Sequence, residues 1–399
     1  MQLKRLLLLF ISISLVLVLT LSFTTSCAKP APKELVIGAI QGLSGPCSEA
    51  GMLGVHGQEA YAEYINSQGG VTIKGEKYNI KIDGTDFACG PDGAVTAYNK
   101  LVYQDKVKFL IGAPFAPVFP VLGEMSDKDK VFMVDESGVG LDITPKSTMT
   151  FVTQPEQAIL KHMYDILLRL YPNVKSVAIF APDEPTGATD IEFSTKEAEA
   201  HGLKVVATDF YAQAETNYQP MMTKLLAAKP DAMVSGMGFT GWKASAIKQA
   251  RELGWMGPML ETTCSGDVRD TVAMLGQYNS DFLTGSYNAA DPSLPPEAKQ
   301  IGDIIKQKYG ETLTVDHITQ GWQPIMVIVQ AIQLAQSLDP VVVRDTLEKA
   351  TSVDTPFGKG SIGGLKTFGF NHAIVRPSVC YQIMNGQINL VEWYTPTLP

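Results

Sequence analysis

The segment LVIGAIQGLSGPCSEAGMLGVHGQEAYAEYINSQGGV, residues 35–71, contains an apolar run, a glycine-rich turn and an amphipathic stretch in direct succession. The apolar run predicts a short buried strand, and the turn QGLSGP follows it. A helix is predicted next, and the pair Gly69–Gly70 ends it. A strand that leads through a turn into a helix is the repeating unit of a parallel α/β sheet. Apolar side chains on one face of this helix are Val55, Ala60, Tyr61, Tyr64 and Ile65.

The same alternation of strands and helices continues beyond this segment. Strands are expected at 78–87, 108–113 and 131–137, with helical stretches between them. The pattern restarts after Phe151, with helix and strand pairs that end in the strand 258–263. Two further helices are expected at 297–309 and 321–336, and the tail 371–394 is expected to form a hairpin that turns at Asn385–Gly386. The chain is therefore an α/β protein with two parallel-sheet units in series.

The N-terminus has the composition of a secretory signal peptide. Lys4 and Arg5 precede an apolar stretch over 6–21, and small residues lead to Cys27. A charged start, an apolar centre and a small-residue end are typical of a signal that is removed. An uncleaved membrane anchor is the alternative, although the apolar stretch is short for a full span.

Composition argues against nucleic acid as a partner. Of the 32 basic residues, Lys4 and Arg5 lie in the signal segment, which leaves 30 against 41 acidic residues and a net charge of −11. Such a chain has no basic stretch to neutralise phosphates. Four cysteines follow the signal: Cys47, Cys89, Cys264 and Cys380. An even number in an exported protein permits two disulfides, and no metal-binding spacing appears.

Taken in order, several segments resemble one family. These are 35–71 with its Ser44–Gly45–Pro46 turn, DGTDFACGPDGAVTAYNKLV at 83–102, KFLIGA at 108–113 and IKQARELGWMGPML at 247–260. They resemble the type I periplasmic solute-binding fold, in the leucine/isoleucine/valine-binding branch of ABC-importer receptors. The resemblance covers nearly all of residues 34–395.

The resemblance implies two Rossmann-like lobes with central parallel sheets, joined by a hinge of three chain crossings that closes on ligand. The crossings would fall near 153–155, 282–287 and 377–379. Lobe one would comprise 34–153 and 285–377, and lobe two 154–284 and 378–399. Two independent sequential domains are the alternative, which leaves the late helices and the hairpin unexplained.

The resemblance also gives the first cysteine a role. Thr25, Ser26 and Cys27 resemble the lipobox of bacterial lipoproteins, although Thr24 stands where a leucine is usual. Residues 1–26 would then be the signal and 27–33 a tether, with Cys27 carrying the lipid. A lipid-anchored or periplasmic protein outside the cytoplasm is expected, and a plain secreted cysteine is the alternative.

Relatives that bind amino acids hold the carboxylate with a serine and backbone N–H groups, and the ammonium with an acidic residue. The position of the carboxylate-binding serine aligns with Ala116, which Pro117 follows. The position of the acidic residue that binds the ammonium aligns with Thr263. Alanine has no hydroxyl, and proline has no N–H. Other ligand positions of the family align with Ala50, Ser137, Gly138, Thr186 and Phe239.

The altered positions imply that the ligand is not a plain α-amino acid, because its charges would be desolvated without partners. Phe115, Phe239 and Trp322 are candidate apolar walls for an aromatic or short aliphatic acid or amide. Val118 is a further candidate, whereas core packing is favoured for Phe119 and Trp242. Asp135 and Glu136 would either contact a donor-rich ligand or lie solvated at the loop edge.

Relatives often carry a small disulfide that begins at the position of Cys89, but its usual partner position holds Phe115 in this chain. Cys47 is the favoured partner, because the resemblance implies that its loop neighbours that of Cys89. A pairing of Cys264 with Cys380 is a weaker expectation, since buried unpaired cysteines are common.

The predicted function is that of a receptor that traps a small solute and delivers it to an ABC permease, with no catalysis, cofactor or metal. A ligand-sensing receptor module is one alternative. A hydrolase that uses Cys264 is another, but no histidine stands in a pattern that places it beside this residue, and the usual catalytic motifs are missing.

Overall fold

The computed structural model of the chain describes residues 31–45, 47–113, 118–135, 144–153, 158–183, 185–212, 216–236, 238, 240–262 and 266–398. Met1–Lys33 is a unit separate from Glu34–Pro399, and the fold below is that of the second unit.

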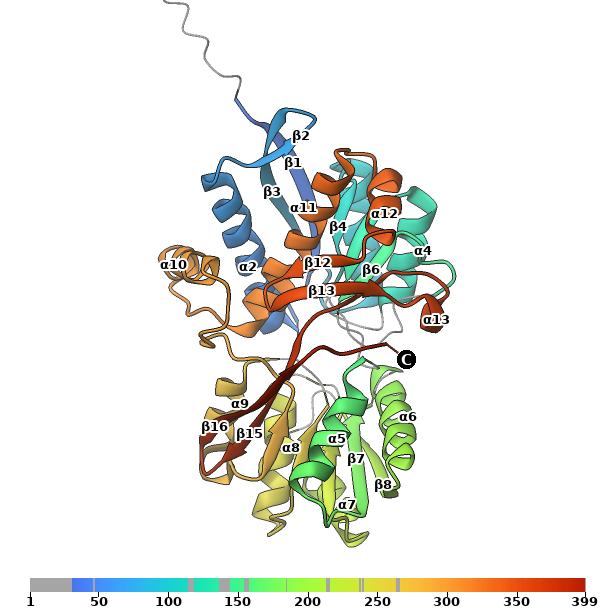
Figure 1. Cartoon of the computed structure of the whole chain (residues 1–399), viewed down its shortest axis with the longest axis vertical. Coiled ribbons are helices and arrows are strands. Elements are labelled where there is room, and N and C mark those ends of the chain that lie inside the picture. The colour runs from blue at the N-terminus through green and yellow to red at the C-terminus, as the bar shows by residue number, and fades with distance from the viewer. Residues whose placement is uncertain are drawn as a thin grey trace, which may run out of the picture. The chain divides into compact units, whose positions relative to one another are not determined.

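Two β-sheets organise this unit (Figure 1). Among the described residues the first has nine strands, in spatial order β12 (Ser352–Thr355), β13 (Gly358–Gly363), β14 (Ala373–Val375), β6 (Thr150–Thr153), β5 (Phe132–Asp135), β4 (Phe109–Ile111), β1 (Lys33–Gln41), β3 (Glu76–Asp86) and β2 (Val71–Ile73). In the same part of the chain the second has seven, in the order β16 (Gln387–Tyr394), β15 (Ser378–Met384), β11 (Phe282–Thr284), β10 (Met259–Glu261), β9 (Ala232–Ser235), β7 (Ser176–Pro182) and β8 (Lys204–Tyr211).

The chain passes between the sheets more than once. Strands β1 to β6 build the first sheet and β7 to β11 build the second, after which β12 to β14 return to the first and β15 and β16 to the second. Two independent sequential domains would not exchange strands in this way. The predicted two-lobe α/β architecture is confirmed, and we call the first sheet with its helices lobe one and the second sheet with its helices lobe two.

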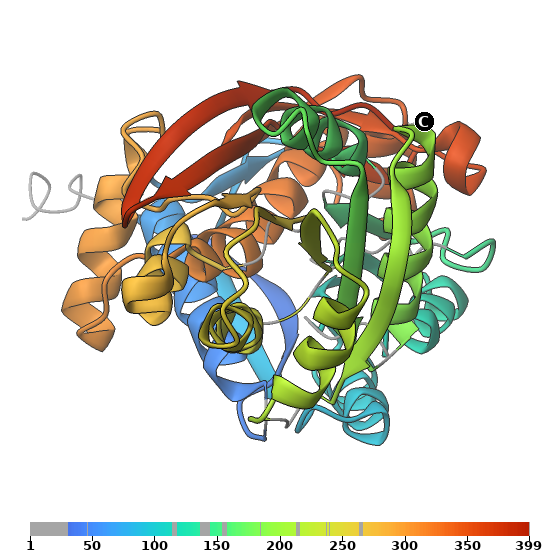
Figure 2. The same ribbon diagram turned by 90° about the horizontal axis from the view of Figure 1, so that it is seen from below.

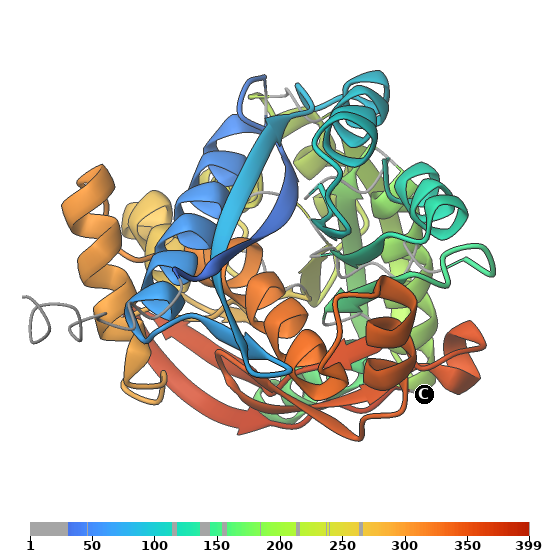
Figure 3. The same cartoon turned by 90° about the horizontal axis from the view of Figure 1, so that it is seen from above.

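Helices cover both faces of the first sheet (Figure 3). Phe109 and Phe132 face a core shared with α2 and α11, whereas Leu110 and Met133 face α3 and α4. Period-2 alternation of apolar side chains on both faces is what a doubly covered parallel sheet requires. The helical elements of lobe one are α2 (Ser48–Ser67), α3 (Pro91–Asn99), η1 (Lys100–Gln104), α4 (Phe119–Asp129), α10 (Glu297–Tyr309), η5 (His317–Trp322), α11 (Gln323–Ala335), α12 (Pro340–Glu348) and α13 (Leu365–Phe368).

The second sheet is covered in the same manner (Figure 2). Val177 and Val234 pack toward α5 and α6, whereas Phe180 and Met233 pack toward α7, α8 and α9. The helical elements of lobe two are α5 (Leu160–Leu170), α6 (Pro185–Ala200), α7 (Gln219–Ala227), α8 (Thr240–Glu252), α9 (Val268–Leu275) and η4 (Gly276–Tyr278).

Glycine allows α2 to approach η5 closely. A Cβ atom on Gly57 would lie 2.1 Å from the carbonyl oxygen of His317, and one on Gly321 would lie 2.7 Å from the Cα of Gly57. Any larger side chain at either position would force the two backbones apart. The glycines of the segment that opens the fold therefore serve helix packing as well as the turn after β1.

The central strands of both sheets are parallel, as predicted. Antiparallel pairs flank them at β2–β3, β12–β13–β14 and β11–β15–β16. One sequence expectation needs correction. The tail does form a hairpin that turns at Asn385 and Gly386, both at positive φ, but it covers β15 and β16 only. Residues 373–375 instead form β14, which pairs with β6 of lobe one.

Among the described residues, no single helix is long and apolar enough to cross a bilayer. The segments His317–Ala335 and Pro340–Glu348 pass the length and composition test only as a pair bent by 95°. Many of their apolar side chains, including Ile325 and Val343, are buried in the core of lobe one, whereas Leu334 and Val342 are exposed.

Candidate functional site

The carboxyl ends of the parallel strands are where ligands bind in open α/β sheets. In lobe one these ends are at Gln41, Ile111, Asp135 and Thr153. In lobe two they are at Pro182, Ser235, Glu261 and Thr284. The described residues at these ends define the base of a candidate ligand site on each lobe.

In lobe one, Asp86 organises the turn after β1. Its carboxylate accepts hydrogen bonds from the hydroxyl of Ser44 (2.6 Å) and from the N–H groups of Leu43 (2.9 Å) and Ala88 (2.8 Å). Burial raises the pKa of Asp86, but these hydrogen bonds outweigh it and hold the pKa below its usual value. Asp86, at the end of β3, therefore fixes the conformation of the turn after β1 that contains Leu43 and Ser44.

A disulfide joins the same two loops. Cys47 and Cys89 are bonded, with their Cα atoms 5.9 Å apart, and this is the pairing that the family resemblance favours. Gly42 lies directly against the bond, since a Cβ there would be 2.4 Å from the sulfur of Cys47. The turn after β1 and the turn after β3 therefore form one cross-linked rim of lobe one.

In lobe two, a buried polar network occupies the strand ends. The ammonium of Lys243 in α8 contacts the carboxylate of Glu261, the last residue of β10, and both side chains are at most 2% exposed. The hydroxyls of Thr284 and Ser286, at and beyond the end of β11, also donate to Glu261. Three neighbouring elements are thus held together by one charged centre.

Two of the predicted ligand positions lie at strand ends as expected. Ala50 is in the first turn of α2 after β1, and Thr186 is in the first turn of α6 after β7. Ala50 is 8% exposed and Thr186 is fully buried. Six other predicted ligand residues lie outside the described residues: Phe115, Ala116, Ser137, Gly138, Phe239 and Thr263. Cys27, Pro117, Glu136 and Val139 lie outside them as well.

Trp322 packs against α2. Its side chain is fully buried, and its ring lies 5.6 Å from that of Tyr61 in α2. Its role as a wall of the ligand site stays a prediction. Phe119 and Trp242 follow the favoured core interpretation: Phe119 is fully buried, and Trp242 packs edge-on to Tyr211.

Asp135 does not lie solvated at a loop edge. It ends β5 with its side chain fully buried, and a Cβ on Gly112 would lie 2.8 Å from its Oδ2. Of the two other cysteines, Cys380 is buried in β15, and Cys264 lies outside the described residues, so their pairing stays a prediction.

One cluster in lobe one has the composition of a metal site. The ligating atoms of His56, Glu311 and His317 lie within 4.8 Å of one another. The backbone N–H of Thr314 donates to Nδ1 of His317 (3.1 Å), so the proton of this imidazole is assigned to Nε2, which donates to Glu311 (3.0 Å). Histidines that bind metal usually donate their other ring N–H outward, whereas Nδ1 of His317 accepts from the backbone of Thr314, whose hydroxyl lies 2.8 Å from the same atom. The cluster is a hydrogen-bonded junction between α2 and η5.

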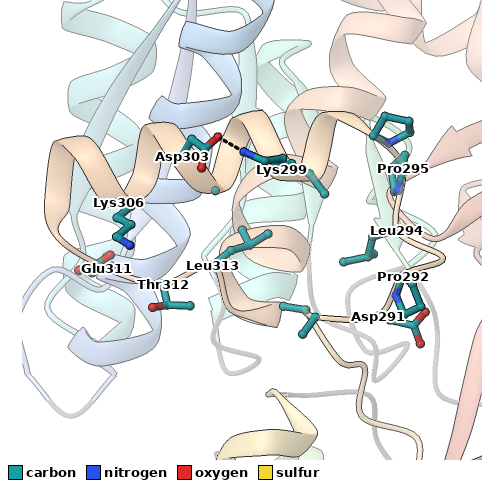
Figure 4. Close-up of a pocket in the computed structure, with 15 residues that line it drawn as sticks. Asp291, Pro292, Leu294, Pro295, Lys299, Asp303, Lys306, Glu311, Thr312 and Leu313 are labelled. Atoms are coloured by element: carbon teal, nitrogen blue, oxygen red, sulfur yellow. Dashed lines mark hydrogen bonds and ion pairs between the residues drawn. The ribbon is translucent and has the colours of Figure 1, made fainter.

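A pocket of about 420 Å³ lies beside α10, between segments 289–296 and 311–313 (Figure 4). Lys299 and Asp303 form an ion pair of 2.6 Å along the helix, and Lys306 and Glu311 stand at one end. None of the residues that line it belongs to a strand end or to the predicted ligand positions. This pocket is therefore separate from the candidate ligand site.

Sequence reasoning missed the charged network of lobe two. Lys243 lies in the first turn of α8, and a lysine in such a position is usually solvent-exposed. Glu261 ends an apolar strand directly before Thr262, and this position is the one local signal of a buried acidic group.

Comparison with known proteins places the chain in a family. The periplasmic binding protein family matches residues 34–387. A Leu/Ile/Val-binding protein homologue of Brucella melitensis is 25% identical over 349 residues, which cover 84% of this chain and 89% of that protein. An amino acid binding protein of Pseudomonas aeruginosa is 25% identical over 342 residues, with coverages of 82% and 85%.

Solved structures share the fold at lower identity. An amino acid ABC transporter substrate-binding protein from Pseudomonas fluorescens has a TM-score of 0.77 at 17% identity and covers 92% of this chain and 97% of its own. A solute-binding protein from Rhodopseudomonas palustris in complex with 4-hydroxybenzoate has a TM-score of 0.75 at 18% identity, with coverages of 91% and 98%. The interleaved two-sheet architecture and the match over 34–387 together establish that this chain belongs to the periplasmic binding protein family.

Proposed function

We propose that this protein is the extracytoplasmic solute-binding receptor of an ABC importer and performs no chemistry on its ligand. The observation that carries the proposal is the exchange of strands between two α/β sheets, together with the family match over most of the chain. In this arrangement the carboxyl ends of both sets of strands supply ligand loops, and closure of the lobes traps a small molecule.

The hinge is proposed to consist of three crossings near 153–155, 282–287 and 377–379. Lobe one would comprise 34–153 and 285–377, and lobe two 154–284 and 378–399. Strand membership supports these limits: β6 ends at Thr153 in the first sheet, β11 ends at Thr284 in the second, and β14 and β15 lie on either side of Pro377.

The ligand is proposed to be an aromatic or short aliphatic acid or amide rather than a plain α-amino acid. A zwitterion needs one partner for its carboxylate and another for its ammonium. These cannot be supplied by alanine at 116, proline at 117 and threonine at 263. In lobe two the carboxylate of Glu261 is already bound to Lys243, Thr284 and Ser286, so it offers a ligand ammonium little unpaired charge. Structures of this fold exist with benzoate, 4-hydroxybenzoate and isoleucine.

The ligand site is proposed to include Ala50, Phe115, Ala116, Ser137, Gly138, Thr186, Phe239, Thr263 and Trp322. A lipid on Cys27 would tether the receptor to a membrane beside its permease, with 27–33 as the flexible connection.

A thermal-shift screen of residues 28–399, refolded to remove bound solutes, tests the proposal. The panel comprises leucine and valine, benzoate and 4-hydroxybenzoate, short aliphatic carboxylates, their amides and urea. A ligand at 100 times its Kd should stabilise the protein by about 2.7 kcal/mol, which is a measurable rise in Tm.

Each outcome discriminates between ligand classes. Stabilisation by carboxylates or amides alone supports both the receptor role and the altered specificity. A large rise with leucine would overturn the ligand class and leave the receptor role in place. If no member of an extended solute panel changes Tm, the receptor role itself is contradicted.

A further inference from the structure

A buried arginine stands in the third crossing between the lobes, where the chain runs from β14 to β15. Arg376 is 4% exposed. Its Nη1 donates to Oε1 of Gln323 at the start of α11 (2.6 Å), and its Nε donates to the hydroxyl of Tyr287 (3.2 Å). Its guanidinium carbon also lies 5.2 Å from the ring centre of Tyr287 and 5.4 Å from that of Phe357. The side chain therefore contacts lobe one and the second crossing at once.

Tyr287 completes the connection from the second crossing. Its hydroxyl donates to the carbonyl of Pro377 in the third crossing (2.7 Å), and its ring stacks on Phe357 of lobe one at 3.7 Å. Its backbone also bonds to lobe two, because its carbonyl accepts the N–H of Val268 at the start of α9 (3.0 Å). Tyr287 is 1% exposed.

A buried guanidinium is costly unless its donors are bonded, and here two of them are bonded to Gln323 and Tyr287. The guanidinium carbon lies beside the stacked rings of Tyr287 and Phe357, at nearly equal distances from their centres. The planar fork of arginine suits this arrangement, since it donates in two directions at once. The two crossings and lobe one therefore move together as long as Arg376 and Tyr287 remain in contact.

We propose that Arg376 and Tyr287 form a hinge clamp that limits how far the lobes open. The proposal rests on the proposed function, in which closure traps the ligand. A receptor whose open state is restrained reaches the closed state at a smaller cost, so the clamp raises ligand affinity without contacting ligand. Arg376 and Tyr287 are positioning residues in this scheme.

Two variants of residues 28–399 test the clamp, with one matched control. Tyr287→Phe removes the hydroxyl and its two hydrogen bonds but keeps the stacked ring, so folding should be retained. Arg376→Gln removes the charge and the fork. Tyr164→Phe is the control, because the buried hydroxyl of Tyr164 also donates to a backbone carbonyl, that of Ser194, within lobe two.

The distance between the lobes is measured by spin labels on p-acetylphenylalanine at Lys128 of α4 and Glu199 of α6, two exposed positions on different lobes. This chemistry leaves the native cysteines untouched. The ligand-free distance distribution should broaden and lengthen in Tyr287→Phe and more in Arg376→Gln, and remain unchanged in Tyr164→Phe. Affinity is measured with benzoate as the probe and should weaken on the order of 5- to 10-fold in both clamp variants.

The failure of the clamp and the failure of the receptor role give different results. Unchanged ligand-free distances in both variants overturn the clamp, whatever their affinity for benzoate. A lower Tm with unchanged distances shows only a structural role and also overturns it. If the wild type closes on no solute, the proposed function fails, and the ligand-free distances still decide whether the clamp exists.

Discussion

Lys243 and Glu261 form a buried ion pair at the carboxyl edge of the second sheet, with their side chains 2% and 1% exposed. The pair joins the start of α8 to the end of β10, and Thr284 extends it to β11. A buried pair adds little net stability compared with apolar side chains, but the loss of one partner leaves a buried charge without compensation.

Replacing Lys243 by methionine should therefore lower the free energy of unfolding by about 3–5 kcal/mol. Adding Glu261→Gln to this variant should restore most of the loss, because no uncompensated charge then remains. Urea unfolding of both variants measures the effect. The exposed pair Lys299–Asp303 provides the control, since Lys299→Met should cost less than about 1 kcal/mol. Equal losses for Lys243→Met and Lys299→Met would contradict the interpretation of the buried pair.

The disulfide between Cys47 and Cys89 closes a loop with a sequence separation of 42. In the chain-entropy description a loop of this length contributes about 4 kcal/mol to stability. Reduction should lower Tm and loosen the rim that carries Ser44 and Asp86. A double variant, Cys47→Ser with Cys89→Ser, should have the same low Tm with and without reductant. If the wild type shows no change on reduction, the bond does not stabilise lobe one.

His372 should make the protein less stable in mild acid. Its ring is 1% exposed and stacks on Phe151, and burial, with the charge of Arg344 as the second cause, lowers its pKa to about 4. The unfolded chain takes up this proton near pH 6.5, whereas the folded chain does so only near its lowered pKa. The stabilisation that the neutral, buried imidazole gives the folded state is fully present above pH 6.5 and is lost as the pH falls toward 4. The free energy of unfolding should fall by about 3 kcal/mol in total.

The measurement is urea unfolding between pH 8 and pH 4.5 for the wild type and His372→Gln. At pH 8 the imidazole is neutral in both states, so the difference between the proteins there reports packing alone. The variant should lose less stability on acidification. Parallel curves over the whole range would show that His372 does not cause the acid sensitivity.

Much of the fold could be predicted because its signals are local. The run 35–41, the turn after it and the apolar face of α2 are all contained in one stretch, and the turn at Asn385–Gly386 is encoded by two residues. The hairpin of β12 and β13 was missed because both strands are short, β13 is glycine-rich, and β13 joins the sheet by pairing with β14.

The site was harder to predict, because its contacts join residues that are distant in sequence. Nothing near Lys243 indicates that Glu261 will be its partner, and nothing near Arg376 indicates the ring of Tyr287. The glycines at 57 and 321 let η5 lie close against α2, where Trp322 packs on Tyr61, and this contact also joins distant parts of the sequence.

Finally, the cluster of His56, Glu311 and His317 should not respond to zinc. Its stability comes from two imidazole N–H groups that donate to Oε2 of Glu311, at 2.8 Å from His56 and 3.0 Å from His317. Burial raises the pKa of Glu311, but these hydrogen bonds outweigh it and lower the pKa. Zinc would need Nε2 of His317 without its proton, and the N–H of Thr314 opposes that tautomer. Tm should be equal in saturating zinc and in EDTA, whereas Glu311→Gln should cost about 1–3 kcal/mol by leaving a buried donor poorly bonded. A rise of Tm with zinc that His317→Ala abolishes would show that the ring can adopt the other tautomer and that the cluster does bind metal.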